Sequence, residues 1–138
     1  MTVSYPMILL ATVASFMFGA IWYGGFSRRW LAALGKTDEE LKASAGFAVP
    51  MVVTFVAQLV MAWVMAGILA HLLKGGVAVS LRNGMLTAAI LWLGFVATTL
   101  ASNHSFQGAR RMLTVIDAGH WLGVLLIQGA ILGGWGMR

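Results

Sequence analysis

One acidic residue lies inside an otherwise uncharged part of the chain. Asp117 precedes the charge-free residues 118–137, and His120 and Gln128 fall on its side of a helix at about 100° per residue. A carboxyl group and an imidazole three residues apart can bind a ligand or pass a proton. An ionisable side chain within a membrane span is therefore a candidate functional residue.

Other polar residues are expected at the same level, because they end or precede neighbouring helices on that side. They are Asn103, His104, Tyr23, Arg28 and Arg29. With Asp117 and His120 they predict a compact polar cluster. Two interpretations remain open: a structural ion pair between Asp117 and Arg110, Arg111 or Arg28, or a site for a ligand or a proton.

Metal, cofactor and catalytic sites have little support in the sequence. Asp117, His104 and His120 carry atoms that suit zinc or iron, but no dense ligand motif surrounds them. The chain has no Cys, and His71 lies at the opposite end from the other histidines, which disfavours haem. No serine lies in a nucleophile elbow. We therefore expect no metal, no cofactor and no catalytic residue.

The elements that must position these residues follow from the distribution of charge. Of the 138 residues, 60% are hydrophobic and 9% are charged, where a soluble domain has about 25% charged residues. Four charge-free runs are each long enough to span a bilayer: residues 1–27, 43–73, 83–109 and 118–137. The predicted fold class is an all-α integral membrane bundle in a single domain, residues 1–138. Its four transmembrane helices are expected at residues 5–26, 47–73, 83–102 and 112–135.

A short interfacial helix is predicted in the first link. Thr37 and Glu40 have the spacing of a capping box, in which each side chain bonds the other residue's backbone N–H.

Orientation follows from the basic residues beside the spans. The first and third links carry Arg28, Arg29, Lys36, Lys42, Arg110 and Arg111, and the other side carries Lys74, Arg82 and Arg138. The positive-inside rule places the first and third links in the cytoplasm and both termini outside.

Small residues at helical intervals are expected to let the helices pack closely in lipid. These residues are Ala11, Ser15, Gly19, Ala62, Ala66, Gly94, Thr98, Gly119 and Gly123. The pattern fits packing within one chain, or a homodimer formed through the Gly119 and Gly123 face. Gln58 and Gln128 lie near mid-membrane and are expected to bond each other or a backbone carbonyl.

Several segments resemble one small bacterial membrane-protein family, domain of unknown function 1761. They include Trp22-Tyr23, Trp30, residues 35–41, residues 94–99, Asn103, Phe106 and residues 116–120. The resemblance covers almost the whole chain. It implies a four-span bacterial inner-membrane protein and implies no activity.

The expected function is non-enzymatic helix–helix interaction, as a homo-oligomer or an accessory subunit of a membrane complex. The alternative is a small transporter or ligand-binding carrier with a polar site around Asp117 and Asn103. The expected partners are the lipid bilayer and either a second copy or another membrane protein. Nucleic acid is not an expected partner, because the basic residues lie beside the spans. The identity of any small-molecule ligand stays open.

Overall fold

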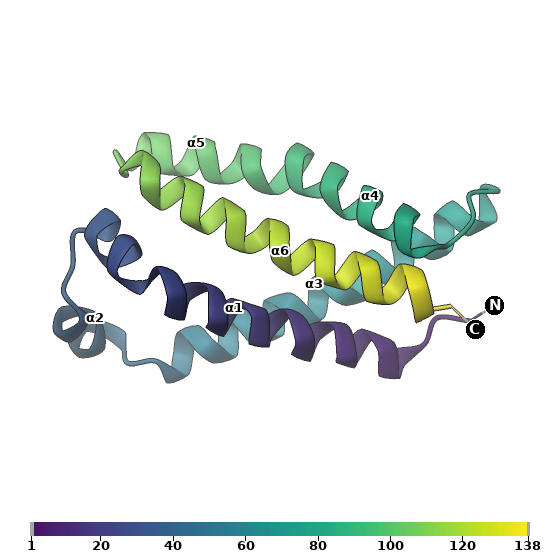
Figure 1. Ribbon diagram of the computed structural model, residues 1–138, viewed down its shortest axis with the longest axis horizontal. Helices are drawn as coiled ribbons and strands as arrows, with labels where there is room; N and C mark the ends of the chain where they lie inside the picture. The colour runs from purple at the N-terminus through teal and green to yellow at the C-terminus, as the bar shows by residue number, and fades with distance from the viewer. Residues whose placement is uncertain (1, 138) are drawn as a thin grey trace.

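The computed structural model describes residues 2–137, which form an elongated all-helical bundle (Figure 1). Its elements are α1 (Tyr5–Leu34), α2 (Asp38–Ala45), α3 (Ala48–Lys74), α4 (Leu81–Leu91), η1 (Trp92–Ala97), α5 (Thr98–Phe106) and α6 (Arg111–Trp135). Within residues 2–137, four helical segments are long and apolar enough to cross a membrane: α1, α3, the continuous segment from α4 to α5, and α6. The predicted four-helix membrane bundle is confirmed.

Local sequence explains where α1 ends and where α2 begins. Helix α1 continues well beyond Phe26, because nothing between there and Leu34 breaks a helix, and it ends at Gly35 with a left-handed φ of 73°. The predicted capping box is confirmed at α2. The Glu40 N–H donates to Thr37 Oγ1 at 3.1 Å, and Glu40 Oε2 accepts from the Thr37 N–H at 3.4 Å.

The third span contains a π-helical turn, η1, that the sequence pattern did not predict. Two hydroxyl groups just after its end bond backwards to carbonyls within it: Thr98 Oγ1 donates to the Gly94 carbonyl at 2.9 Å, and Thr99 Oγ1 donates to the Phe95 carbonyl. Such bonds compete with the regular backbone pattern and distort helices. The span predicted at residues 83–102 is present, as part of residues 81–106, and contains this one π-helical turn.

Helix α6 packs against α1, α3 and α4, and glycines allow the closest approaches. A Cβ on Gly84 would lie 2.0 Å from the carbonyl oxygen of Gly129 and 2.9 Å from the Cα of Gly133. Trp22 of α1 covers Gly119, and Phe18 covers Gly123. The expectation that the Gly119 and Gly123 face forms a homodimer is therefore wrong, because α1 already occupies it.

The other predicted packing residues divide into two groups. Those on α1 and α3 are buried within the chain: Ala11, Ser15, Gly19, Ala62 and Ala66. Gly94 and Thr98 instead lie exposed on the outer side of the third span, and a Cβ on Gly94 would meet nothing within 4 Å. The prediction that they pack inside the bundle is wrong, because α6 contacts a different side of that helix.

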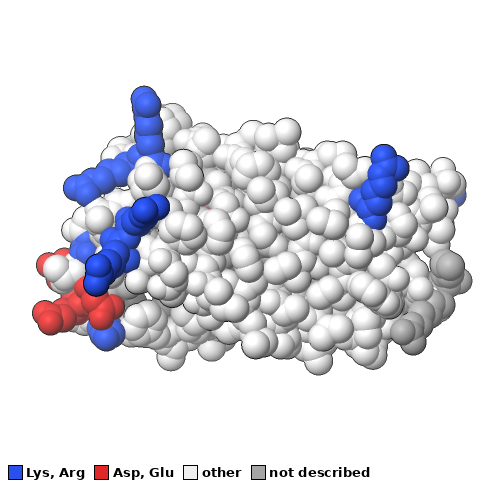
Figure 2. Space-filling view, viewed as in Figure 1, with Lys and Arg blue, Asp and Glu red and all other residues white. Residues whose placement is uncertain are grey.

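Charged side chains gather at the two ends of the molecule and leave a broad uncharged band between them (Figure 2). Both termini lie at one end, where Val3 pairs with Met137 and the Ser4 N–H donates to the Gly136 carbonyl at 2.9 Å (Figure 1). Helix α2 and the start of α6 lie at the other end. The uncharged band is the surface expected to contact lipid hydrocarbon.

Gly84→Ala should destabilise the bundle by about 1–3 kcal/mol, because the added methyl group forces α4 away from α6. The measurement is the unfolding free energy in detergent. Gly67→Ala is the matched control, since a Cβ there meets nothing within 4 Å. Equal losses of stability in both variants would contradict the close α4–α6 contact.

Candidate functional site

Asp117 bonds a tyrosine from α1 and lies near a histidine from α5. Tyr23 donates its hydroxyl proton to Asp117 Oδ1 at 2.7 Å. The other carboxyl oxygen, Oδ2, lies 3.9 Å from His104 Nε2, and His104 Nδ1 is 2.9 Å from Thr114 Oγ1. The side chains of His104 and Asp117 are only 12% and 19% exposed. The carboxyl group thus joins α1, α5 and α6 through groups that are mostly withdrawn from the surface.

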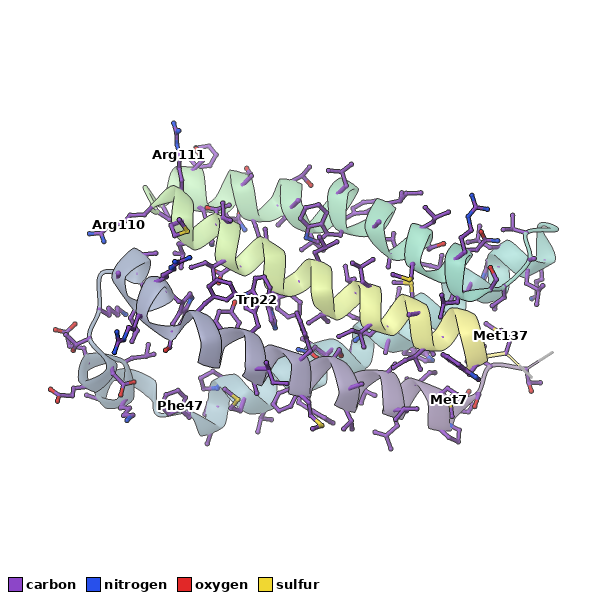
Figure 3. The ribbon with its side chains drawn as sticks, viewed as in Figure 1. Met7, Trp22, Phe47, Arg110, Arg111 and Met137 are labelled. Carbon is purple, nitrogen blue, oxygen red and sulfur yellow. The ribbon has the colours of Figure 1, made fainter. Side chains whose placement is uncertain are left out.

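Two indole groups fix α6 on either side of Asp117. Trp22, which points from α1 toward α6 in Figure 3, donates to the Ile116 carbonyl at 3.1 Å. Trp92, the first residue of η1, donates to the Ala118 carbonyl at 2.8 Å. These two bonds, one from α1 and one from η1, fix the turn of α6 that carries Asp117. The side chain of Asp117 is therefore preorganised.

Three predicted members of the cluster lie outside it. Arg28 and Arg29 are exposed near the end of α1, and among the described residues no arginine forms an ion pair with Asp117. Long basic side chains reach water at a helix end at little cost, whereas the buried carboxyl group finds uncharged donors nearby. Asn103 is exposed on α5, because its neighbour His104 takes the inward position about 100° away.

The arginines of the third link do not form the ion pair with Asp117 that was one of the two interpretations of the sequence. Arg110 donates to the carbonyl of Ala32 at the end of α1, and Arg111 is exposed (Figure 3). Within residues 2–137, no three His, Asp or Glu side chains are grouped to hold a metal ion.

A second polar group lies deeper in the bundle, at the middle of the spans. Gln128 Nε2 donates to the backbone carbonyl of Gln58 at 3.0 Å and to Ser15 Oγ at 3.1 Å. Ser15 Oγ lies 2.8 Å from Gln58 Oε1 and 3.1 Å from the Thr12 carbonyl, so its single proton serves one of these acceptors at a time. All three side chains are fully buried. The expected bond from one glutamine to a backbone carbonyl is confirmed.

His120 lies one turn from Asp117 on α6 but bonds neither it nor any other described residue. Its ring is 3% exposed and packs against Tyr23, Trp121 and Phe18, with ring centroids 4.8, 4.7 and 6.3 Å away. Its Nε2 lies so close to Gly19 that a Cβ there would approach within 2.7 Å. Its Nδ1 is buried without a hydrogen-bond partner in the described part of the chain. The imidazole therefore borders the space enclosed by α1, α3 and α6.

That space is a cavity of about 600 Å³ between α1 and α3, within the range of small-molecule sites. Helix α2 borders its outer end, and Gln58, His120 and Trp121 line its inner part. Tyr23 lies in its wall while donating to Asp117. Gln58 Nε2, like His120 Nδ1, is buried without a partner among the described residues. An apolar cavity with a few buried polar groups is the usual form of a ligand site.

Comparison with known proteins places the chain in a family. A family of proteins of unknown function, DUF1761, matches residues 6–133, which is nearly the whole chain. The chain belongs to the DUF1761 family. No curated protein and no solved structure matches it.

In this DUF1761 protein, the cavity depends on residues with weak sequence signals. Gln58 is visible as a lone amide in an apolar helix, and Ser15 as one small residue among several. Gly24 lines the cavity, although its spacing from Gly19 matches no packing pattern. The signal available in the sequence was the shared depth of Gln58 and Gln128, which indicates a polar layer without indicating a cavity.

Asp117→Leu should destabilise this DUF1761 protein by about 1–3 kcal/mol, because the Tyr23 hydroxyl loses its acceptor in a partly buried position. Asp117→Asn keeps an acceptor oxygen and should stay near the wild-type stability. Unfolding in detergent measures both variants, and Tyr23→Phe completes a double-mutant cycle. A fully stable Asp117→Leu protein would show that the bond does not support the fold.

Proposed function

We propose that this protein is a non-enzymatic bacterial inner-membrane protein that binds a membrane-soluble small molecule in the cavity between α1 and α3. The observation that carries the proposal is the pair of buried, unpartnered groups beside the cavity, Gln58 Nε2 and His120 Nδ1. An unsatisfied buried polar atom costs about 1–3 kcal/mol, which a bound molecule with suitable polar atoms recovers.

The proposed ligand site does not include Asn103, and Asp117 acts there as a positioning residue. Asp117 does not line the cavity but holds the hydroxyl group of Tyr23, which does. Exposed Ala20 and Gly24 border the cavity within an apolar span. Small residues at this edge leave room for a ligand to enter the cavity from the bilayer.

The proposed orientation has α2 and the link before α6 in the cytoplasm and both termini outside. The support is the excess of basic residues in these two links. Labelling of Lys36→Cys from either side of the membrane measures this orientation, since the chain has no other Cys.

Gly24→Leu should fill the cavity and weaken binding of the neutral apolar dye Nile red at least tenfold. A Cβ at Gly24 meets nothing within 4 Å, so the larger side chain occupies empty space without forcing the helices apart. The saturable fluorescence of purified protein in micelles, above that of protein-free micelles, measures binding.

Gly25→Leu is the matched control for this experiment. Gly25 is the next residue on α1, has equally open surroundings and is not among the residues that line the cavity. Equal dye binding by the wild type and both variants would place the dye elsewhere and contradict the proposal.

Self-association is a second candidate function, because one small-residue face is left unused within the chain. Gly94, Thr98 and Ser102 are exposed at intervals of four residues along the third span, which has the smallest buried share of the four. Small residues at this spacing allow two helices to approach closely in lipid. On this proposal the chain forms a homo-oligomer, or joins another membrane protein as an accessory subunit.

Gly94→Leu should convert an oligomer into a monomer, because the side chain separates the two facing helices without disturbing the fold. Light scattering of the purified protein in mild detergent measures the mass of the complex. Gly67→Leu on α3 is the control, since its surroundings are equally open. A wild-type protein that is monomeric in both detergent and nanodiscs would contradict self-association.

A further inference from the structure

The chemistry of the cavity indicates which kind of molecule it takes, provided that the proposed function holds. Its inner part offers uncharged hydrogen-bonding groups. Gln58 carries an amide, and His120, in its neutral form, carries one donor and one acceptor nitrogen. Both residues line the cavity, both are nearly or fully buried, and each has an atom without a partner among the described residues.

The two groups are separated along the bundle by about one helical turn. Ser15, which bonds Gln58, lies four residues from Gly19, which His120 covers. Four residues span about 6 Å along a helix. A ligand that reaches both groups therefore needs polar atoms on opposite sides of a small rigid unit, or one polar atom between them.

Flat aromatic side chains form much of the surrounding wall. They are Phe16, Tyr23, Trp30, Phe47 and Trp121. Aromatic faces favour offset or edge-on contact with another ring. The Tyr23 hydroxyl is already bonded to Asp117, so its ring, rather than its oxygen, is what the wall presents.

The charge of the lining disfavours an ionic head group. Among the described residues that line the cavity, the one charged side chain is Asp38, at the outer end on α2, where Lys42 pairs with it at 2.9 Å. Arg28 and Arg29 do not line the cavity. A phosphate or carboxylate would meet an acidic group at the mouth and no lysine or arginine inside, and a buried unpaired charge is very costly.

We infer that the cavity takes a neutral ring that carries carbonyl oxygens on an apolar tail, the chemistry of a membrane quinone. The ring lies among the aromatic side chains, and its oxygens meet Gln58 and His120. The tail leaves past Ala20 and Gly24, the exposed small residues at the edge of the cavity, into the bilayer. The inference concerns binding alone.

Three probes with the same tail separate this class from its rivals: a decyl-substituted benzoquinone, decylbenzene and decanoic acid. Each is titrated into the purified full chain in nanodiscs, with empty nanodiscs as the blank, and calorimetry measures affinity. The benzoquinone should bind at least tenfold more tightly than either other probe.

His120→Phe should weaken benzoquinone binding about tenfold, because it removes a hydrogen-bonding nitrogen while keeping a flat ring. The control is His71→Phe, an exposed histidine near the opposite end of α3 that bonds the Gly67 carbonyl. Gln58→Leu is less suitable as a first test, since the Gln58 side-chain oxygen Oε1 also accepts the buried hydrogen bond from Ser15.

Each outcome decides between the two proposals. If decylbenzene binds as tightly as the benzoquinone and Gly24→Leu abolishes both, the cavity binds ligands but the inferred class is wrong. Tighter binding of decanoic acid would also overturn the class, in favour of an anionic lipid. If no probe binds above the blank, the inferred class is wrong. The proposed function fails with it if Nile red binding is also equal in the wild type, Gly24→Leu and Gly25→Leu. If His120→Phe binds the benzoquinone as tightly as the wild type, the imidazole does not contact the ligand.

Discussion

The rest of this bundle depends on a requirement of the hydrocarbon interior: a polar group placed there must find its partner within the protein. Ser15, Gln58 and Gln128, which come from α1, α3 and α6, meet that requirement for most of their polar atoms by bonding one another. Gln58 Nε2 and Gln128 Oε1 are the two atoms of this group that have no partner among the described residues. Apolar side chains cannot fix the rotation of these helices, because lipid tails solvate them as well as protein does. The hydrogen bonds among these three residues can fix the rotation, since turning any one helix would leave a buried amide or hydroxyl group without a partner. They therefore set which sides of α1 and α3 face each other, and with that the position of the cavity above them.

Helix α6 uses each of its small-residue faces for a different neighbour. Toward α4, Gly129 and Gly133 bring two backbones into contact, and toward α1, Gly119 and Gly123 accept the rings of Trp22 and Phe18. The difference has a structural consequence. Backbone contact leaves no space at the α4 side, whereas the rings of Trp22 and Phe18 fill the space between α1 and α6 at Gly119 and Gly123. The cavity lies on the side of α1 that faces α3, beside Gly19 and His120.

Apolar length and capping chemistry made the helices predictable, because both act within a few residues of sequence. The same reasoning put Asp117, Tyr23 and His104 at one level, since depth follows from counting residues along a span. It failed for Asn103, Arg28 and Arg29, because depth says nothing about rotation: Asn103 and His104 share a level, and only one of them can face α6. The cavity depends on how the helices meet, which no single helix encodes. For that reason the lone acid was visible in the sequence, while the space beside it was not.

The lone acid and the cavity are parts of one arrangement, and Tyr23 joins them. Its ring belongs to the cavity wall, and its hydroxyl group ends on Asp117, whose backbone neighbours are held by Trp22 and Trp92. Without that acceptor, the hydroxyl group would need another polar partner, and the unpartnered atoms of Gln58 and His120 belong to residues that line the same cavity. Asp117 thus keeps the tyrosine oxygen out of the ligand space and leaves Gln58 and His120 as its hydrogen-bonding groups. A carboxyl group that does not contact the ligand can in this way determine which polar groups the cavity offers to it.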